Sequence, residues 1–153
     1  MAELNKKVEV KTIYRFPVIH RFLPKKLEYF LYKKGISAPG SQNVLITSIY
    51  AMINMGYSKI FLYGADHSWT SQMIVNQSNQ VCLSDHHFYD ILPSALNPWL
   101  KADGSPYKMH EILDDLRRAF YSYHELNSYA LYIGAVTIIN MTKMSFIDAF
   151  EKQ

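Results

Sequence analysis

The sequence has few of the features that would assign it to several large classes of protein. It contains one cysteine, Cys82, among 153 residues, which excludes an internal disulfide and a thiolate zinc cluster. No apolar run approaches the roughly 20 residues of a membrane-spanning helix, and the first residues lack the apolar core of a signal peptide. We therefore expect a single cytoplasmic domain over residues 1–153, without a transmembrane segment.

Charge of one sign is also scarce. The net charge is +3, and no basic stripe is interleaved with aromatic residues, so we do not expect nucleic-acid binding. The basic residues gather at Lys25, Lys26, Lys33 and Lys34, which leaves peripheral contact with a membrane surface or an anionic ligand open. No His-x-x-His or Glu-x-x-His spacing occurs, so we predict no metal site and keep direct metal binding by Asp66, His67, His86 and His87 only as a weaker alternative.

Aromatic residues are abundant by contrast. They make up 14% of the chain, with twelve tyrosines. A tyrosine provides apolar area together with a hydroxyl that needs a hydrogen-bond partner. Sugar and base binding use that combination, and so does core packing, so both interpretations stay open.

The stretch from Ser41 to Trp69 is the most informative part of the chain. Apolar residues at helical spacing end at Gly56, and a short apolar run over 59–63 has the length of a buried strand. Gly64, Asp66 and His67 follow that strand directly. Ligands of open α/β sheets bind at the carboxyl ends of the strands, so this cluster is a candidate site. The alternative is an ordinary turn in which Asp66 acts as a cap.

The remaining segments complete an alternating pattern. We predict a strand over 8–14, an amphipathic helix over 21–34 that ends at Gly35, and Ser41 as the N-cap of the next helix. In the first helix we expect the inward side chains to be Phe22, Leu27, Phe30 and Leu31.

The second half of the chain carries three further predicted elements. A hairpin over 73–83 should fold over the site, and a long helix over 107–133 should place Ile112, Leu113, Leu116, Ala119, Phe120, Tyr123 and Leu126 inward. A strand over 135–140 and a closing helical turn over 145–150 follow. This order predicts a parallel sheet. Residues 41–66 and 107–150 would form a nucleotide-binding-like core, residues 1–40 a preceding strand and helix, and residues 67–106 a lid.

Two segments carry a family resemblance. Residues 42–66, with Met-Gly-Tyr followed by Lys-Ile-Phe-Leu-Tyr-Gly-Ala-Asp, resemble the carboxyl-terminal half of the bacterial lipooligosaccharide sialyltransferases and the related 6-hydroxymethylpterin diphosphokinase-like proteins. Residues 131–150 are similar to the closing strand and turn of the same group. The resemblance implies a Rossmann-like, three-layer α/β fold with a short parallel sheet. The family's Gly-x-Gly-Pro-Ser turn after the first strand has no counterpart here, and Lys143 stands where relatives tend to have proline.

The resemblance also implies site residues. Gln42 and Asn43 would hold the nucleotide and its phosphate at a helix N-terminus, where free N–H groups and the helix dipole attract anions. Gly64, Asp66 and His67 would line the donor pocket, with Trp69 as a stacking wall.

In the sialyltransferases a histidine of the lid is the general base, and His86, His87 and His110 are candidates for that role. We select His87, which has the acidic neighbours Asp85 and Asp90, and His110, which begins the long helix.

Three functions stay open from sequence. The first is a sialyltransferase-type glycosyltransferase domain that uses a nucleotide-activated sugar, without a further cofactor, to modify a glycan acceptor in cell-surface glycan (lipopolysaccharide) biosynthesis. The second is magnesium-dependent pyrophosphoryl transfer to a pterin, with Mg²⁺ held by Asp66 and nearby acids. The third is a noncatalytic partial domain, lacking an amino-terminal half, that binds a protein partner or a second copy of itself.

Overall fold

The computed structural model describes residues 23–83 and 96–153. The chain divides into two compact units, Met1–Ala38 and Pro39–Gln153, and each is described here by itself. The predicted strand over 8–14 and the candidate bases His86 and His87 lie outside the described residues. Among the helices of the described ranges, none is both long enough and apolar enough to cross a membrane.

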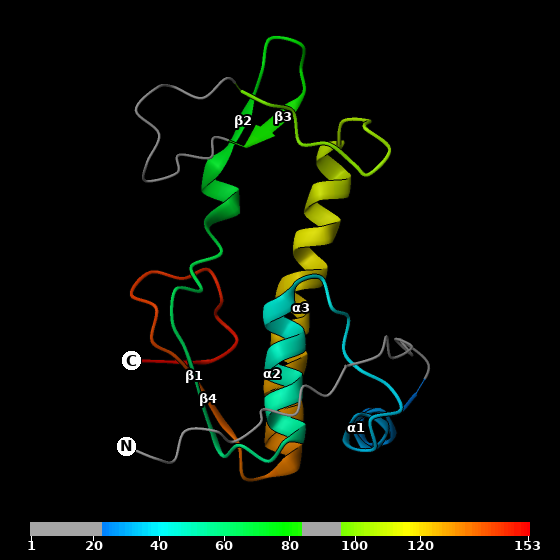
Figure 1. The fold of residues 1–153 in the computed structure, drawn as a ribbon, viewed down its shortest axis with the longest axis vertical. Coiled ribbons are helices and arrows are strands. Elements are labelled where there is room, and N and C mark those ends of the chain that lie inside the picture. Colours follow the sequence, from blue (N-terminus) through cyan, green and yellow to red (C-terminus); the bar gives the residue numbers. More distant parts are fainter. Residues whose placement is uncertain (1–22, 84–95) are drawn as a thin grey trace, which may run out of the picture. The chain divides into compact units, whose positions relative to one another are not determined.

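Helix α1, Lys25–Lys33, lies in the first unit (Figure 1). It starts after Pro24, whose φ of −55° suits the residue before a helix. The buried Glu28 carboxylate accepts hydrogen bonds from Lys25 Nζ at 2.8 Å and from the Tyr32 hydroxyl at 2.9 Å. The helix ends as predicted before Gly35, which has a φ of 67°.

The predicted inward face of α1 is wrong for Leu27 and Phe30, while Leu31 is half-buried and Phe22 lies outside the described residues. Leu27 and Phe30 are 43% and 45% exposed, whereas Tyr29 and Tyr32 are buried. The buried residues of the helix are Glu28, Tyr29 and Tyr32, and the Tyr32 hydroxyl finds its partner on Glu28 one turn earlier. A tyrosine with a satisfied hydroxyl thus takes the place that the apolar pattern assigned to leucine and phenylalanine.

In the second unit, helix α2 spans Val44–Asn54. Four residues at helical spacing are buried on one face, namely Ile46, Ile49, Tyr50 and Ile53. The predicted N-cap, Ser41, is wrong, because the cap is Asn43. Its backbone is extended and its Oδ1 accepts the Ile46 N–H at 3.1 Å.

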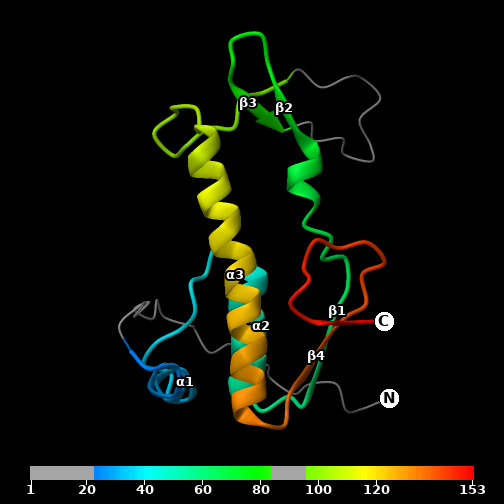
Figure 2. The ribbon, with the colours of Figure 1, turned by 180° about the vertical axis from the view of Figure 1, so that it is seen from behind.

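Helix α3, Met109–Ile133, packs against α2 (Figures 1 and 2). It ends at Gly134, whose φ of 83° is a left-handed conformation that favours glycine. The predicted stripe is confirmed for most positions, since Ile112, Leu116, Ala119, Tyr123 and Leu126 are buried. Phe120 is half-buried, and Leu113 is 49% exposed because it lies beside the stripe of 3.6-residue period.

The sheet contains β1 (Lys59–Leu62), β4 (Thr137–Asn140) and β5 (Glu151–Lys152), in the order β1-β4-β5. Both pairings are parallel. The alternation of helices and strands predicted the parallel pairing of β1 with β4, whereas strand β5 was not predicted. The closing helical turn over 145–150 is wrong, because that segment is irregular and leads into β5. The buried Asn140 side chain holds this segment, since its Nδ2 donates to Ser145 Oγ and to the Ile147 carbonyl.

The predicted hairpin is confirmed as β2 (Met73–Val75) and β3 (Val81–Leu83), which pair antiparallel after the short helix η1 (Ser68–Gln72). Val81 packs with Ile112 and Leu116 of α3 in an apolar cluster, hereafter the Val81 cluster. The described chain is therefore an α/β protein with a short, parallel, three-stranded sheet. The finer Rossmann-like, three-layer arrangement stays a prediction.

Candidate functional site

The turn after β1 is the predicted site, and the loop after β4 braces it. Gly64, with a φ of 65°, turns the chain directly after the strand. Ala65 then donates its N–H to Thr142 Oγ1 at 3.0 Å and accepts a hydrogen bond from Ser145 Oγ at 2.6 Å. The Phe146 N–H donates to the Asp66 carbonyl at 2.8 Å. These bonds fix the backbone from which Asp66 and His67 project.

Asn140 organises that brace from the end of β4. Its side chain is fully buried, donates to Ser145 Oγ at 2.9 Å and accepts the Thr142 N–H at 3.0 Å. A buried amide without these partners would destabilise the fold. The loop after β4 therefore keeps the conformation in which the Asn140 side chain is hydrogen-bonded.

His67 lies next to this turn in a left-handed backbone conformation, with φ 53° and ψ 41°. That conformation costs a non-glycine residue on the order of 1 kcal/mol, so contacts of the side chain must hold it. The imidazole stacks on Trp69, with the ring centroids 4.2 Å apart, and meets Tyr123 and the edge of Phe120. Contacts with three aromatic side chains therefore hold the His67 imidazole in place.

A directed chain of hydrogen bonds joins His67 to helix α2. The Asn43 amide orientation is set, because Oδ1 accepts the Ile46 N–H of the helix cap. The Tyr123 hydroxyl donates its proton to the same oxygen at 3.1 Å. His67 Nε2, 2.5 Å from the Tyr123 oxygen, must then be the donor of that pair. The neutral imidazole therefore carries its proton on Nε2, and Nδ1 keeps an acceptor lone pair.

The electrostatics keep this chain uncharged near neutrality. Burial lowers the pKa of His67 below its usual value, while the neighbouring Asp66 carboxylate acts weakly in the opposite direction. Burial also raises the pKa of Tyr123 to about 12, against a smaller lowering by the hydrogen bond to Asn43. Both groups are then neutral and can hold the donor–acceptor order described above.

Asp66 has a different environment. It is exposed, and its Oδ2 accepts the Ser68 hydroxyl at 2.5 Å. That hydrogen bond is the main cause that lowers the pKa of Asp66. Asp66 is therefore an ionised carboxylate at neutral pH, paired with the Ser68 side chain, while the N-cap position of η1 belongs to His67 and has no side-chain cap hydrogen bond.

A cavity of about 210 Å³, hereafter the aromatic cavity, lies beside the hydrogen-bond chain. The N-terminus of α2, helix η1, the segment before α3 and the first half of α3 all contribute to its walls. The lining residues are Gln42, Asn43, Trp69, Trp99, Tyr107, Ile112, Asp115, Leu116 and Ala119. Three aromatic side chains and two amides thus face one space, with a single carboxylate.

The predicted site residues divide into three groups. Gln42, Asn43 and Trp69 line the aromatic cavity, and His67 is in contact with Trp69. Gly64 and Asp66 belong to the turn after β1 and are not among the lining residues.

The two selected bases lie elsewhere. His110 is exposed in the first turn of α3 and does not line the cavity. His87 lies outside the described residues.

Sequence reasoning missed Trp99, Tyr107 and Asp115 of the cavity and the role of Tyr123. Tyr123 was predicted as a core residue. A buried tyrosine hydroxyl needs a hydrogen-bond partner, and this was the one indication in the sequence that Tyr123 has a polar role. Trp99 and Tyr107 were included only within a long predicted lid. They meet at 6.0 Å between ring centroids because the chain folds back between them, which local patterns do not reveal.

No group of three or more His, Cys, Asp or Glu side chains that could hold a metal ion occurs within residues 23–83 and 96–153. Comparison of the chain with protein-family models, curated proteins and solved structures returned no match.

Proposed function

We propose that this chain is a Rossmann-like glycosyltransferase domain of the sialyltransferase type, which transfers a sugar from a nucleotide-activated donor to a cell-surface glycan. One observation carries the proposal. Asn43, His67 and Tyr123 come from three separate elements and converge in one hydrogen-bond chain, next to an aromatic cavity and beyond the end of β1. Convergent polar groups beside an apolar pocket are typical of a ligand site.

The composition of the cavity supports a ligand with rings and hydroxyl groups. Trp69, Trp99 and Tyr107 offer apolar ring faces, and Gln42 and Asn43 bring amides to the same space. Aromatic faces bind the apolar sides of sugar and base rings, while amides form directed hydrogen bonds. A nucleotide-activated sugar and its glycan acceptor contain both kinds of surface.

The proposed reaction is a direct displacement. The acceptor hydroxyl gives its proton to a histidine, and its oxygen forms a bond to the anomeric carbon of the donor sugar. The bond from that carbon to the phosphate oxygen breaks, and the nucleotide leaves with the electron pair. His87 and His110 are the proposed bases. His67 is tested beside them as a third candidate, because its Nδ1 has no hydrogen-bond partner within the described ranges.

Thermal unfolding with a panel of ligands tests the binding step. The panel contains cytidine, uridine and adenosine nucleotides and a nucleotide sugar, each with and without Mg²⁺. We expect a higher melting temperature with a cytidine nucleotide or its sugar conjugate, since a ligand at 100 times its Kd stabilises the folded state by about 2.7 kcal/mol. Replacing Gln42 by alanine should reduce this increase, whereas Gln77→Ala, at an exposed hairpin position, should leave it unchanged.

Other outcomes of the panel would contradict the proposal. An increase with ATP alone that requires Mg²⁺ would favour pyrophosphoryl transfer. No increase with any nucleotide would favour the noncatalytic, protein-binding function.

An activity assay tests the chemistry separately. Release of cytidine monophosphate from its sugar conjugate is measured with a panel of oligosaccharide acceptors for His87→Gln, His110→Gln and His67→Gln. Loss of a general base should lower the rate by about 10²-fold or more. A wild-type rate in each of the three variants would contradict a histidine base.

A further inference from the structure

Formal charge is divided unevenly between the two compact units of the chain. Residues 1–38 contain nine lysines and arginines and three acidic residues, a formal charge of +6. Residues 39–153 contain seven lysines and arginines and ten acidic residues, a formal charge of −3. Such an asymmetry between two parts of one chain is typical of proteins whose basic part contacts an anionic partner. The first unit is therefore where we look for a contact surface.

Helix α1 presents part of this positive charge on one face. Its buried face is formed by Glu28, Tyr29 and Tyr32. Residues three and four positions apart share a face of a helix, and the exposed residues of α1 at these distances from Phe30 surround it on the opposite face. Together with Phe30 they form a patch, hereafter the α1 patch, which consists of Lys26, Leu27, Phe30, Lys33 and Lys34.

The charge of the α1 patch is not offset by acidic side chains. Glu28 is the one acidic residue in the sequence from 23 to 38, and its buried carboxylate is bonded to Lys25 Nζ at 2.8 Å. Lys26, Lys33 and Lys34 form no ion pair with the described part of the chain. Three ammonium groups of α1 thus stay available to an anionic partner.

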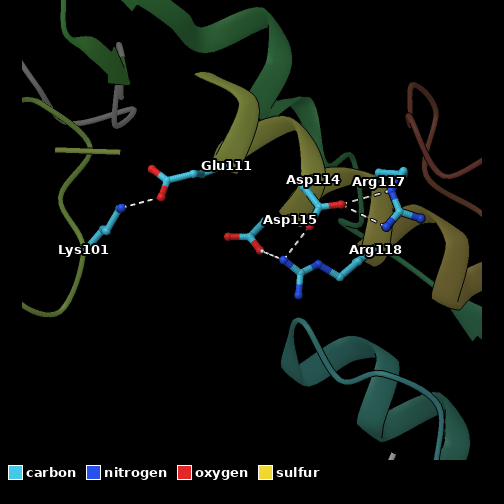
Figure 3. Close-up of polar contacts among 6 residues, drawn as sticks. All are labelled: Lys101, Glu111, Asp114, Asp115, Arg117 and Arg118. Atoms are coloured by element: carbon cyan, nitrogen blue, oxygen red, sulfur yellow. Dashed lines mark hydrogen bonds and ion pairs between the residues drawn. The ribbon is translucent and has the colours of Figure 1, made fainter. Parts of the chain in front are cut away.

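The second unit treats its basic residues differently at the start of α3. Each basic side chain drawn in Figure 3 contacts at least one carboxylate of the same region. The pairs are Lys101 with Glu111, Arg117 with Asp114, and Arg118 with Asp114 and Asp115. Paired charges of this kind attract an anionic surface weakly, because each cation already has an anion beside it. The α1 patch lacks such compensation.

Apolar side chains lie among the lysines of the α1 patch. Leu27 and Phe30 are 43% and 45% exposed, and the Lys34 ammonium lies over the Phe30 ring at 5.7 Å from its centroid. Ile36, just after the helix, is 52% exposed. A nucleic acid backbone would leave these apolar groups in water. The interface of a bilayer accepts both kinds of side chain, since apolar groups enter the acyl boundary while lysines extend to the phosphates.

We propose that the α1 patch binds the surface of a membrane that contains anionic phospholipids. Its lysines attract the lipid phosphates, each strengthening binding by about fivefold, and Leu27 and Phe30 insert between the headgroups. The basic residues alone left a membrane and an anionic ligand open, and the apolar side chains among them decide for the membrane. The proposal does not rest on the glycosyltransferase function, because no nucleotide or glycan takes part in this contact.

Flotation with lipid vesicles tests the contact on the full chain. The protein is mixed with vesicles of phosphatidylcholine alone and with vesicles of phosphatidylcholine and phosphatidylglycerol. We expect at least about tenfold stronger binding to the anionic vesicles, because three unpaired lysines contribute. The preference should largely disappear at 1 M salt, where the Debye length falls to about 3 Å.

A pair of lysine substitutions tests the electrostatic part. Lys33→Gln combined with Lys34→Gln should weaken binding to the anionic vesicles by about tenfold or more. The control combines Lys143→Gln with Lys152→Gln, which removes the same charge from exposed positions of the second unit. It should change binding by less than about twofold, since charges remote from the lipid are screened. Both variants should melt within a few degrees of the wild type, because the substituted side chains are exposed.

A pair of apolar substitutions tests insertion. Leu27→Ser combined with Phe30→Ser should weaken binding to the anionic vesicles by at least about tenfold, because the apolar area that would leave water is lost. The matched control is Leu131→Ser combined with Phe146→Ser, at side chains that are 72% and 50% exposed in the second unit. This control should keep the affinity of the wild type.

Three results would overturn the inference. The first is equal binding to the two kinds of vesicle, or binding to neither. The second is wild-type binding in the lysine variant or in the apolar variant of the α1 patch. The third is binding to a short DNA duplex or a single-stranded RNA without binding to vesicles, which would assign the patch to nucleic acid. The nucleotide panel does not depend on α1, so each of these results would leave the proposed function standing.

Discussion

The two halves of the candidate site are built by different means. At the carboxyl ends of β1 and β4, Asn140 and the Asn43–Tyr123–His67 chain fix the backbone through directed hydrogen bonds. In the aromatic cavity, tryptophan and tyrosine side chains rest on the apolar Val81 cluster and leave space between them. Removing one atom of a hydrogen bond leaves its buried partner unsatisfied, which destabilises the fold. The side chains that border an open cavity have fewer such partners to lose. Stability should therefore depend on the first region and ligand binding on the second.

The largest effect should come from Asn140→Ala. Removing this buried amide leaves Ser145 Oγ, the Thr142 N–H and the Ile147 carbonyl short of a partner, and should lower the free energy of unfolding by about 2–3 kcal/mol. Urea unfolding measures the change. Asn97→Ala, at an exposed position, is the control and should stay within about 0.5 kcal/mol of the wild type. Equal losses in the two variants would refute the role of Asn140.

Next in size is the helix cap. Asn43→Ala removes the acceptor of the Ile46 N–H and should destabilise the chain by about 1–2 kcal/mol. Asn43→Asp keeps a cap oxygen and replaces an amide nitrogen that is buried without a partner in the described part of the chain, so its loss should be smaller. Ser41→Ala should have almost no effect. A larger loss for Ser41→Ala than for Asn43→Ala would restore Ser41 as the cap.

Tyr123→Phe should have a smaller effect, about 1 kcal/mol, because one hydroxyl that bridges His67 and Asn43 is lost while the buried ring stays. Tyr121→Phe, two residues away on α3 and 51% exposed, is the matched control. A double-mutant cycle with His67→Gln should give a non-additive energy. Strict additivity would show that the hydrogen bond contributes nothing to stability.

The smallest effect concerns pH. Burial lowers the pKa of His67 in the folded chain below its usual value of 6.5. Below about pH 6.5 the unfolded chain therefore binds a proton that the folded chain does not, and stability falls as the pH drops. The loss comes from this one group and is complete once the pH falls below the lowered pKa of the folded chain.

Urea midpoints between pH 5 and 7.5 measure this loss for the wild type and for His67→Gln. The variant should have the flatter profile. His110→Gln, at an exposed position, should keep the slope of the wild type. A wild-type slope in His67→Gln would contradict the assignment.

Much of the fold followed from local patterns. The apolar spacing in α2 and α3, the glycine that ends α3 and the alternation around β2 and β3 predicted those elements, because helix and strand periodicity are properties of neighbouring residues. The errors occurred where a polar contact outweighed the apolar pattern. Tyr32 displaced the expected face of α1 through Glu28, and Asn140 held residues 145–150 out of a helical turn.

The site was predictable only in part. The turn after a strand drew attention to His67 and Trp69, and the family resemblance to Gln42 and Asn43 at a helix N-terminus. Of these four residues, Gln42, Asn43 and Trp69 line the aromatic cavity. Trp99, Tyr107 and Asp115 were missed. They join Trp69 only after the segment before α3 folds back on the hairpin, where the Trp99 N–H bonds to the Val81 carbonyl at 2.9 Å.

The sequence by itself determined the class of the chain, its helices and hairpin and the strand end at which to look, since all of these depend on residues close together along the chain. Only the tertiary structure decided which atoms meet there. Tyr123 lies 80 positions from Asn43 and 56 from His67, yet its hydroxyl joins them. Contacts over such separations depend on how the whole core packs, and for that reason neither the direction of the His67 proton nor the walls of the aromatic cavity could be read from local patterns.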